Sequence, residues 1–337
     1  MKAVGYYLPG PIDRTDALVD IELPDPVPGP RDLLVEVRAI SVNPVDTKVR
    51  AASAPAEGQA KVLGWDVAGV VRAVGSDVTL FRPGDEVFYA GSIARPGGNS
   101  ELHTVDERIV GRKPASLDFA QAAALPLTAI TAWELLFDRL GVARDGGEGQ
   151  TLLVVGAAGG VGSILAQLAR RLTRLRIIGT ASRTETVRWV KDLGAHEVID
   201  HSRGIVDELR RIGIPQVTHI ASLTHTDTHF AQLVEAIAPQ GRLGLIDDPA
   251  QLDANPLKRK AVSLHWEFMF TRSLFETDDM VEQHALLDEV SALVDAGVLR
   301  TTVGDHYGTI DATHLGRAHR LLESGKARGK IVLEGFA

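Results

Sequence analysis

Short apolar runs separated by proline and glycine dominate the chain from its N-terminus to near Phe119. Examples are DLLVEVRAISV (Asp32–Val42) and DVAGVVRAVG (Asp66–Gly75). Runs of this length that end at turn residues predict strands. Proline at every second position from Pro24 to Pro30 excludes a helix interior there. We therefore predict a small, irregular β-barrel or sandwich for this part of the chain.

From Thr151 onward, apolar runs alternate with segments whose apolar residues recur at helical spacing. This alternation is typical of a doubly wound parallel sheet, and it predicts an α/β fold. Before it, DFAQAAALPLTAITAWELLFDRL predicts a helix broken at Pro126. The last strand, in KARGKIVLEG, is expected to return to the first domain, after a long helix around Leu286–Val294. The other expected strands are TLLVVG, RIIGTAS, EVID, VTHIASL, GRLGLI and SLHWEFMF, and the expected helices are GSILAQLARRL, TETVRWVKDLG, VDELRRI and HFAQLVEAIA.

The composition excludes several classes of function. With 337 residues, of which 45% are hydrophobic and 24% charged, the chain is typical of a globular protein with a substantial core. A net charge of −8 argues against a general binder of nucleic acid or acidic membranes. The absence of cysteine excludes disulfides and thiolate zinc ligands. With no signal peptide and no apolar run near ~18 residues, we predict a cytoplasmic protein without membrane or nucleic-acid partners.

The stretch LLVVGAAGGVGSILAQLAR (Leu152–Arg170) passes from a strand into a helix through small residues. Glycine lets the backbone approach a pyrophosphate, and the free N–H groups and dipole at a helix start favour an anion. The residues that align with Gly-x-Gly-x-x-Gly are Ala157, Gly159 and Gly162. Because the motif follows a strand and opens a helix, we predict a dinucleotide site. The alternative is a tight turn that only packs well.

The end of the next strand selects between the two nicotinamide dinucleotides. NADH sites usually carry an acid there, about 20 residues after the glycines, for the ribose hydroxyls. This chain has Ala181, Ser182 and Arg183 instead, and Ser182 and Arg183 can both bind a 2′-phosphate. We therefore predict NADPH in preference to NADH. In the alternative, Arg183 is a solvated charge and Glu185 binds the ribose.

Several segments spread over the chain resemble the quinone oxidoreductase branch of the medium-chain dehydrogenase/reductase superfamily. They are AAGGVG, SVNPVDTKVR, LGWDVAGVVRAVG, RPGDEVFYAG, LPLTAITAWELL and GKIVLE. APQGRLGLIDDP and SLHWEFMFTRSLF resemble its subgroup of zinc-type alcohol dehydrogenase-like proteins. The resemblance implies a GroES-like catalytic domain over residues 1–125 and 272–337, a Rossmann NADPH-binding domain over residues 126–271, and a cleft between them. It also implies a homodimer that forms edge to edge through the Rossmann sheet, with SLHWEFMF as the candidate segment.

The resemblance assigns roles to individual positions. Asn43 matches an asparagine near the nicotinamide, and we expect it, or a water that it holds, to act in catalysis by stabilising the developing oxyanion. Thr131 matches a threonine that touches the cofactor, and His201 replaces a tyrosine beside the adenosine phosphate. The backbone is expected to hold the pyrophosphate at Ala158, Gly159, Gly160 and Val161 and to contact the nicotinamide ribose at Ser222 and Leu223.

The predicted substrate pocket departs from these relatives. Lys48 stands where quinone-reducing relatives often carry a tyrosine, so their substrate specificity does not transfer. We expect Trp65 and Phe268 to form apolar walls. Asp46 and Lys48 form either a proton relay or a surface ion pair. Lys330, in RGK, either supplies positive charge to a cofactor phosphate or lies in a solvated loop.

No zinc is expected. The zinc-dependent branch binds its catalytic metal with Cys, His and Cys, whereas the first two positions here hold Asn43 and Trp65 and the chain has no cysteine. HTDTH (His225–His229) offers two histidines, but an N-cap at Thr226 or Asp227 would place His225 outside the helix. In HWEF, His265 and Glu267 share one strand face, as an acid/base pair or as a structural pair.

Together these features predict a zinc-independent, NADPH-dependent oxidoreductase. Its hydride acceptor would be a quinone or an α,β-unsaturated carbonyl compound, because conjugation delocalises the resulting charge without a metal Lewis acid. One alternative is an NADPH-binding sensor or interaction protein with little turnover. A zinc-dependent alcohol dehydrogenase is disfavoured because its ligands are absent.

Overall fold

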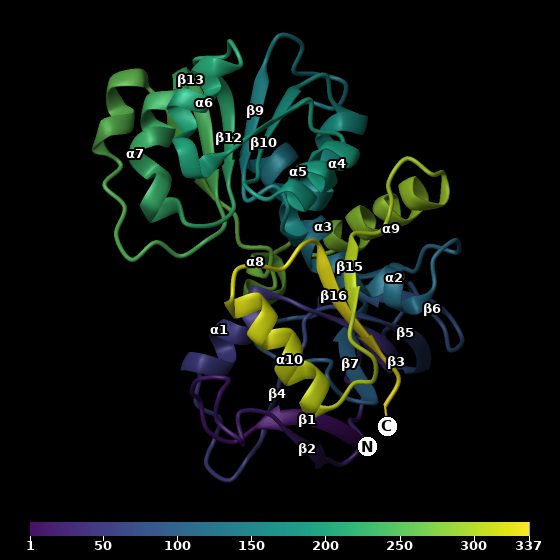
Figure 1. The fold of residues 1–337 in the computed structure, drawn as a ribbon. Coiled ribbons are helices and arrows are strands. Elements are labelled where there is room, and N and C mark those ends of the chain that lie inside the picture. Colours follow the sequence, from purple (N-terminus) through teal and green to yellow (C-terminus); the bar gives the residue numbers. More distant parts are fainter. Residues whose placement is uncertain (337) are drawn as a thin grey trace. The chain divides into compact units, whose positions relative to one another are not determined.

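The computed structural model describes residues 1–336, and the chain divides into two compact units (Figure 1). Unit 1 combines Met1–Ile130 with Phe270–Ala337, and unit 2 is Thr131–Met269. The sequence analysis placed the two boundaries after residues 125 and 271. The first boundary therefore lies five residues further along the chain, and the second lies two residues earlier.

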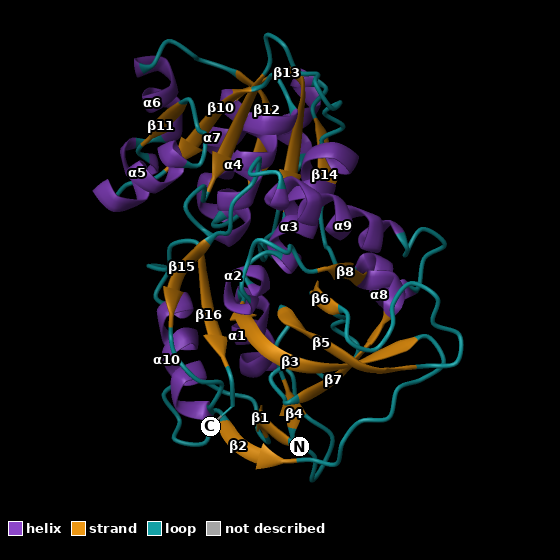
Figure 2. Ribbon diagram, turned by 90° about the vertical axis from the view of Figure 1, so that its right-hand side faces the viewer, coloured by secondary structure: helices purple, strands orange, loops and turns teal. Residues whose placement is uncertain are grey.

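Unit 1 is built on two β-sheets, which Figure 2 shows as orange arrows. Within residues 1–336, a seven-stranded sheet has the order β15-β16-β3-β5-β6-β8, with β7 paired to β3, and a three-stranded sheet has the order β2-β1-β4. The last strand pairs antiparallel with β3, which confirms that the chain returns to the first domain. The strands are β1 (Lys2–Tyr6), β2 (Val19–Glu22), β3 (Asp32–Val42), β4 (Lys61–Val62), β5 (Val67–Val74), β6 (Glu86–Tyr89), β7 (Leu102–Asp106), β8 (Val110–Arg112), β15 (Val303–His306) and β16 (Lys330–Glu334).

Helices of unit 1 come from both ends of its sequence. The sequence analysis predicted the long helix α9 but missed the short helix that follows β3, where Pro44 starts the helix and Asp46 occupies its first turn. The helices are α1 (Pro44–Ala52), the 3-10 turn Glu107–Ile109, α2 (Phe119–Ala123), α8 (Thr271–Phe275), α9 (Glu282–Asp295) and α10 (Ala312–Glu323).

Unit 2, all of whose residues are described, confirms the predicted doubly wound sheet. Its six-stranded sheet is parallel throughout and has the order β11-β10-β9-β12-β13-β14. The strands are β9 (Thr151–Val155), β10 (Arg176–Thr180), β11 (Glu197–Ile199), β12 (Val217–Ser222), β13 (Ile237–Leu245) and β14 (Ser263–Trp266). The helices are α4 (Gly160–Leu172), α5 (Thr184–Asp192), α6 (Ile205–Arg211) and α7 (Thr226–Ala236), with 3-10 turns at His201–Arg203 and Asn255–Lys260.

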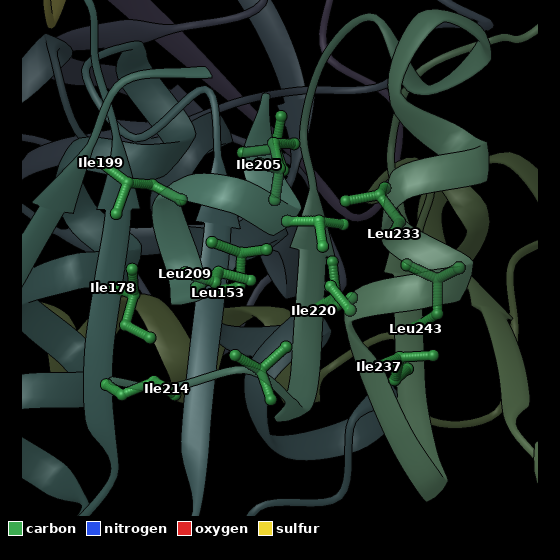
Figure 3. Close-up of a cluster of buried hydrophobic side chains, with 14 of the residues drawn as sticks. Leu153, Ile178, Ile199, Ile205, Leu209, Ile214, Ile220, Leu233, Ile237 and Leu243 are labelled. Atoms are coloured by element: carbon green, nitrogen blue, oxygen red, sulfur yellow. The ribbon is translucent and has the colours of Figure 1, made fainter. Parts of the chain in front are cut away.

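The core of unit 2 explains why its strands read as continuous apolar runs. Figure 3 shows Ile205 and Leu209 of α6 and Leu233 of α7 against strand residues that include Leu153 and Ile220. These side chains are fully buried. α6 and α7 cover one face of the sheet, and α4 packs on β9 and β10 at the other face. Because helices cover both faces, the strands carry apolar side chains on both.

The helical run Phe119–Arg139 leads from unit 1 into unit 2 in the sequence. It contains α2, α3 (Pro126–Trp133) and a π-helical segment (Glu134–Arg139). The predicted break at Pro126 is confirmed, since α3 starts there and the first helical residue needs no N–H donor. Among the described residues, this run alone has the length and composition of a membrane span, and 83% of its apolar window is buried inside the protein.

A buried arginine joins α1 to α10 in unit 1. Arg50 of α1 donates from Nε to Nδ1 of His319 on α10 at 3.3 Å, and its guanidinium also binds Glu323 and the Gly10 carbonyl. Burial, together with the Arg50 charge, lowers the pKa of His319 to about 3. His319 is therefore neutral in the folded protein at neutral pH, and it accepts the Arg50 hydrogen bond in that form.

This neutral histidine predicts a loss of stability in acid. The unfolded chain binds a proton at His319 below about pH 6.5, whereas the folded protein binds it only near pH 3, so the free energy of unfolding falls as the pH falls between these values. We expect His319 to contribute up to about 1.4 kcal/mol per pH unit. Urea unfolding of the wild type and of His319→Gln between pH 4.5 and 7 measures this difference. Parallel curves for the two proteins would contradict the prediction.

Candidate nucleotide site and its supporting cluster

The glycines of the turn between β9 and α4 have different surroundings. Gly156 and Gly162 are required by the backbone, whereas the space beside Gly159 is open. Gly156, with φ +80°, directly follows β9, and a Cβ on Gly162 would lie 2.6 Å from Cα of Ala157. Both positions therefore require glycine for the fold. A Cβ on Gly159, the N-cap of α4, would have only the Gly156 carbonyl oxygen within 4 Å, at 3.5 Å. Space beside Gly159 is open at the start of a helix, where backbone N–H groups attract an anion.

The turn lies at the point where the strand order of the sheet reverses. β9 is flanked by β10 on one side and by β12 on the other, and the carboxyl ends of these parallel strands form one edge. Ser222 ends β12, and its hydroxyl is 2.7 Å from that of Thr226. Open α/β sheets bind ligands at such a point. The fold thus brings the Ala158–Val161 turn and Ser222–Leu223 to the same edge.

The helix after Ser222 begins differently from the prediction. The sequence analysis proposed Thr226 or Asp227 as the N-cap of α7, but the N-cap is His225, in a left-handed conformation with φ +52°. Thr226 is the first helical residue, and its N–H donates to Asp247 at 2.8 Å. Thr226 is therefore capped by a carboxylate from a distant loop, which the local sequence does not reveal.

The two residues proposed to distinguish NADPH from NADH lie against each other. Arg183 is the N-cap of α5, just beyond β10, and its Nε is 3.3 Å from Oε1 of Glu185. Ser182 beside it is exposed. Arg183 and Glu185 are both partly solvent-exposed, so this pair is weak and can be exchanged for a ligand phosphate. The residue proposed to bind the 2′-phosphate, Arg183, and the residue that would bind the ribose in the alternative, Glu185, therefore form one ion pair. This arrangement is compatible with both roles.

His201 lies beyond the end of the neighbouring strand, β11. Its ring centroid is 5.9 Å from that of His229 on α7, in an edge-to-face arrangement, and its Nδ1 is buried without a hydrogen-bond partner among the described residues. β11 pairs with β10, so His201 and Arg183 both follow carboxyl ends at this edge. Thr131 is buried near the beginning of unit 2.

Asn43 of unit 1 is buried, and its amide is hydrogen-bonded at both ends. Its exposed fraction is 1%, and its amide nitrogen donates to Oδ2 of Asp66 at 2.8 Å. Its amide oxygen accepts a hydrogen bond from Nζ of Lys330. Both ends of the amide therefore have internal partners, at the junction of β3 and α1, and direct contact with an oxyanion would need one of these hydrogen bonds to be exchanged.

Of the two alternatives for Lys330, the solvated loop is wrong, because the residue is buried. The residue begins β16, is buried, and forms an ion pair with Asp66 at 2.9 Å. Its ammonium also donates to the Val42 carbonyl at 3.0 Å. All three donors of the ammonium therefore have partners inside unit 1, and the predicted phosphate contact needs one of them to be released.

Asp66 is the centre of this cluster and was not among the predicted site residues, although it stands in the quoted segment LGWDVAGVVRAVG. Its second carboxylate oxygen accepts from the N–H of Leu127 at 2.7 Å, at the start of α3. A carboxylate at a helix N-terminus is stabilised by the dipole. The signal that could have revealed it is an acidic residue directly before a continuous apolar strand.

Asp46 and Lys48 occupy different environments. Asp46 is buried and accepts from the N–H groups of Asn43 at 2.7 Å and Gly64 at 3.0 Å. Burial raises the pKa of Asp46 to about 7. Lys48 is exposed two residues further along α1, and residues at that spacing do not face each other. The structure therefore does not bring the two side chains together as a surface ion pair.

The two predicted apolar walls also differ. Trp65 is buried, its Nε1 donates to the Ser92 carbonyl at 3.1 Å, and it packs edge-to-face on Phe270 at 6.2 Å. Phe268 of unit 2 is 47% exposed. Phe268 is therefore accessible to a ligand, whereas Trp65 mainly packs inside unit 1.

The residues present do not suit a catalytic zinc. The aligned ligand positions hold the Asn43 amide, which has internal partners, and the Trp65 indole, which can only donate. Within residues 1–336, no group of three or more potential ligands gathers. The residues around Gly159, in contrast, suit a dinucleotide. The space beside Gly159, which a side chain would occupy, is open to a pyrophosphate.

His265 and Glu267 do not pair with each other. The His265 ring binds the Ser263 hydroxyl at 3.0 Å, whereas Glu267 binds Nε of Arg139 at 2.8 Å. Neither interpretation of HWEF, an acid/base pair or a structural pair of His265 with Glu267, is therefore correct. The partners of Glu267 come from the π-helical segment, which periodicity does not predict.

Comparisons with known proteins agree with this geometry. The family described as alcohol dehydrogenase GroES-like domain matches residues 29–115, and zinc-binding dehydrogenase matches residues 193–333. A zinc-type alcohol dehydrogenase-like protein of Staphylococcus epidermidis is 37% identical over 99% of both chains. A quinone oxidoreductase of Pseudomonas aeruginosa is 34% identical over 91% of this chain and 92% of that protein.

Two solved structures extend the comparison. A Rhizobium etli protein assigned to the zinc-dependent alcohol dehydrogenases is 58% identical, with a TM-score of 0.96, and the match covers 100% of this chain and 98% of that one. A mycobacterial protein solved in complex with NADPH is 28% identical, with a TM-score of 0.85, over 99% of this chain and 100% of that one.

Proposed function

The chain belongs to the medium-chain dehydrogenase/reductase superfamily, and from this premise we propose that it is a zinc-independent, NADPH-dependent reductase of a quinone or an α,β-unsaturated carbonyl compound. Its place among oxidoreductases follows from the family. The observation that best supports the cofactor is the open space at Gly159, between two glycines that the fold itself requires.

The residues of unit 2 would hold NADPH along the carboxyl edge of the sheet. The N–H groups at the start of α4 and the dipole of this helix would bind the pyrophosphate. Arg183 and Ser182 would bind the 2′-phosphate, with His201 beside the adenosine. Thr131, Ser222 and Leu223 would contact the nicotinamide half. The bound cofactor supplies the hydride, and the protein supplies orientation and a water-poor site.

The proposed class of hydride acceptor follows from the lack of zinc ligands at the aligned positions. Without a zinc Lewis acid, the acceptor must carry its own means of delocalising negative charge, as quinones and enones do. Phe268 is an exposed aromatic side chain of unit 2 that we propose as an apolar wall of the acceptor site. The name quinone oxidoreductase of the Pseudomonas aeruginosa relative supports this class.

Zinc independence is testable by metal removal. NADPH oxidation by the purified protein is expected to continue unchanged after treatment with a strong chelator, and metal analysis is expected to find far less than one zinc per chain. Loss of activity on chelation, restored by zinc, would contradict the proposal.

A second candidate, an NADPH-binding protein with little turnover, is favoured by one observation. The Asn43 amide has internal partners at both ends, so it provides no ready donor for an oxyanion. An acceptor panel distinguishes the two candidates. Tight NADPH binding with no oxidation by quinones or enals would favour the binding protein.

We propose a cytoplasmic homodimer as the assembled state. β14 is an edge strand of the unit 2 sheet, and Trp266 at its end is 52% exposed. Edge strands with exposed apolar residues are ready to pair with a second chain. Light scattering that gives the mass of a monomer would contradict this proposal.

We expect Arg183→Ala to reduce the preference for NADPH over NADH by at least about tenfold, or ~1.4 kcal/mol, because it removes a charged partner of the 2′-phosphate. Fluorescence titration with both cofactors measures the ratio of dissociation constants. Glu185→Gln is the matched control: it releases Arg183 from its 3.3 Å ion pair and is expected to leave or raise the preference. An unchanged ratio in Arg183→Ala would show that Arg183 does not read the phosphate.

A further inference from the structure

Two buried glutamates of unit 2 share one arginine. Glu267 accepts from Nε of Arg139 at 2.8 Å through Oε2, and Oε2 of Glu134 lies 3.9 Å from Nη2 of the same guanidinium. The side chains of Glu134 and Glu267 are 1% and 0% exposed, whereas that of Arg139 is 36% exposed. The cluster is thus closed to water except through the arginine.

The π-helical segment creates this arrangement. Glu134 and Arg139 are its first and last residues, five positions apart, and Leu140 N–H donates to the Leu135 carbonyl with the corresponding i+5 spacing. In an α-helix residues five apart point in different directions, but the wider π turn brings them closer to alignment. One inserted residue therefore aims Arg139 back toward Glu134. Such insertions occur frequently at functional sites.

The cluster lies at the carboxyl edge of the sheet, along which the cofactor is proposed to bind. Glu267 directly follows the carboxyl end of β14, and its N–H still pairs with the Leu245 carbonyl of β13. Glu134 is one helical turn after Thr131, so the two positions share a helix face. Thr131 is the residue proposed to touch the nicotinamide half of the cofactor.

The charges of the cluster do not balance unless one carboxyl is protonated. Burial, and then the adjacent Glu134 carboxylate, raise the pKa of Glu267 far above that of an ordinary glutamate, and Arg139 offsets only part of this rise. Oε1 of Glu267 is buried without a hydrogen-bond partner among the described residues, so no donor stabilises a negative charge on this oxygen. The other titratable or charged groups nearby are His265 on β14, whose pKa is lowered by burial and by the adjacent arginines, and Arg242 on β13.

We propose that the Glu134–Glu267 pair stores the proton that completes the reduction, an inference that rests on the proposed function. An acceptor that takes a hydride from NADPH carries one negative charge and needs one proton. The O–H bond of Glu267 breaks, its proton passes toward the reduced acceptor along that edge, and the electron pair stays on the carboxylate. Arg139 balances the new charge, and water reprotonates the pair.

The test combines Glu267→Gln with measurement of proton uptake. The amide keeps the size of the side chain and an oxygen for Arg139, but it cannot release a proton at neutral pH. In single turnovers with 9,10-phenanthrenequinone, wild-type NADPH oxidation is expected to precede proton uptake from a weakly buffered indicator solution. In Glu267→Gln both are expected to occur in one phase, with the turnover rate at least tenfold lower at pH 8 and without the wild-type alkaline limb of the kcat profile.

Two further variants separate this role from a structural one. Glu134→Gln removes the partner carboxyl, and it is expected to shift the alkaline limb toward lower pH. Glu208→Gln is the matched control, since Glu208 is also a buried partner of an arginine, Arg211 at 2.8 Å, but on α6. Glu208→Gln is expected to keep the wild-type pH profile.

The outcomes separate this inference from the proposed function. A wild type that reduces the quinone, with the same kcat profile in Glu267→Gln, overturns the proton store and leaves the proposed function standing. Simultaneous proton uptake and NADPH oxidation in the wild type overturns it in the same way. A wild type that binds NADPH but never oxidises it overturns both. Delayed uptake that is lost only in Glu267→Gln supports the inference.

Discussion

Lys330→Met is expected to lower the free energy of unfolding by about 3–5 kcal/mol, because it leaves a buried charge without its partner. Asp66, its ion-pair partner at 2.9 Å, is fully buried, and Asp46 lies in the same cluster. Methionine matches the length of lysine but supplies no charge and no donor. The Asn43 amide oxygen would lose its partner as well. Urea unfolding followed by circular dichroism measures the effect.

The double variant Lys330→Met/Asp66→Asn is the control for this prediction. Asparagine can still accept from the Leu127 N–H through its amide oxygen, and the Asp66 charge that Lys330→Met leaves without its partner is removed. We expect the double variant to recover most of the loss. A single variant within about 1 kcal/mol of the wild type would show that the buried pair contributes little net stability.

Gly159→Val is expected to weaken NADPH binding by at least about a hundredfold, or ~2.7 kcal/mol, while the fold is retained. The extended backbone at Gly159, with φ −74° and ψ 179°, accepts any residue, and its Cβ would meet only one atom, at 3.5 Å. The new side chain would instead occupy the space where a pyrophosphate approaches the helix start. Titration with NADPH, together with a circular dichroism spectrum, measures both halves of the prediction.

Gly162→Ala is expected to have the opposite effect to Gly159→Val, a loss of stability before a loss of NADPH binding. Its Cβ would lie 2.6 Å from backbone atoms of Gly156 and Ala157, so this variant is expected to lose stability first. If Gly159→Val binds NADPH as the wild type does, the open space beside the turn is not the cofactor site. If Gly159→Val unfolds as readily as Gly162→Ala, the comparison of the two glycines is wrong.

The elements of unit 2 were predictable because their signals are local and repeated. TLLVVG, RIIGTAS and VTHIASL are apolar runs of strand length, and each became a strand of the parallel sheet. The glycine turn was equally predictable. Gly156 needs glycine because its φ is positive, and Gly162 needs it because the backbone of Ala157 lies too close for a Cβ. The helix break at Pro126 follows from the chemistry of proline alone.

Long-range partners were not predictable from one sequence. Lys330 and Asn43 are 287 residues apart, and only the pairing of β16 with β3 brings them together. The RGK segment suggested a cofactor-phosphate contact or a solvated loop, and neither interpretation revealed that Lys330 is buried and paired with Asp66. Likewise, one inserted residue in the π-helical segment joins Arg139 to Glu267, and no periodicity of apolar positions signals it.

The most direct test of the central claim is NADPH oxidation by the purified, metal-free wild type with 1,2-naphthoquinone, 9,10-phenanthrenequinone and an enal as acceptors, followed by absorbance of the reduced cofactor. Gly159→Val serves as the blank. The account predicts turnover with at least one of these acceptors, faster with NADPH than with NADH, and none above background in Gly159→Val. Failure of the wild type to bind either cofactor, or turnover only after zinc is added, would contradict it.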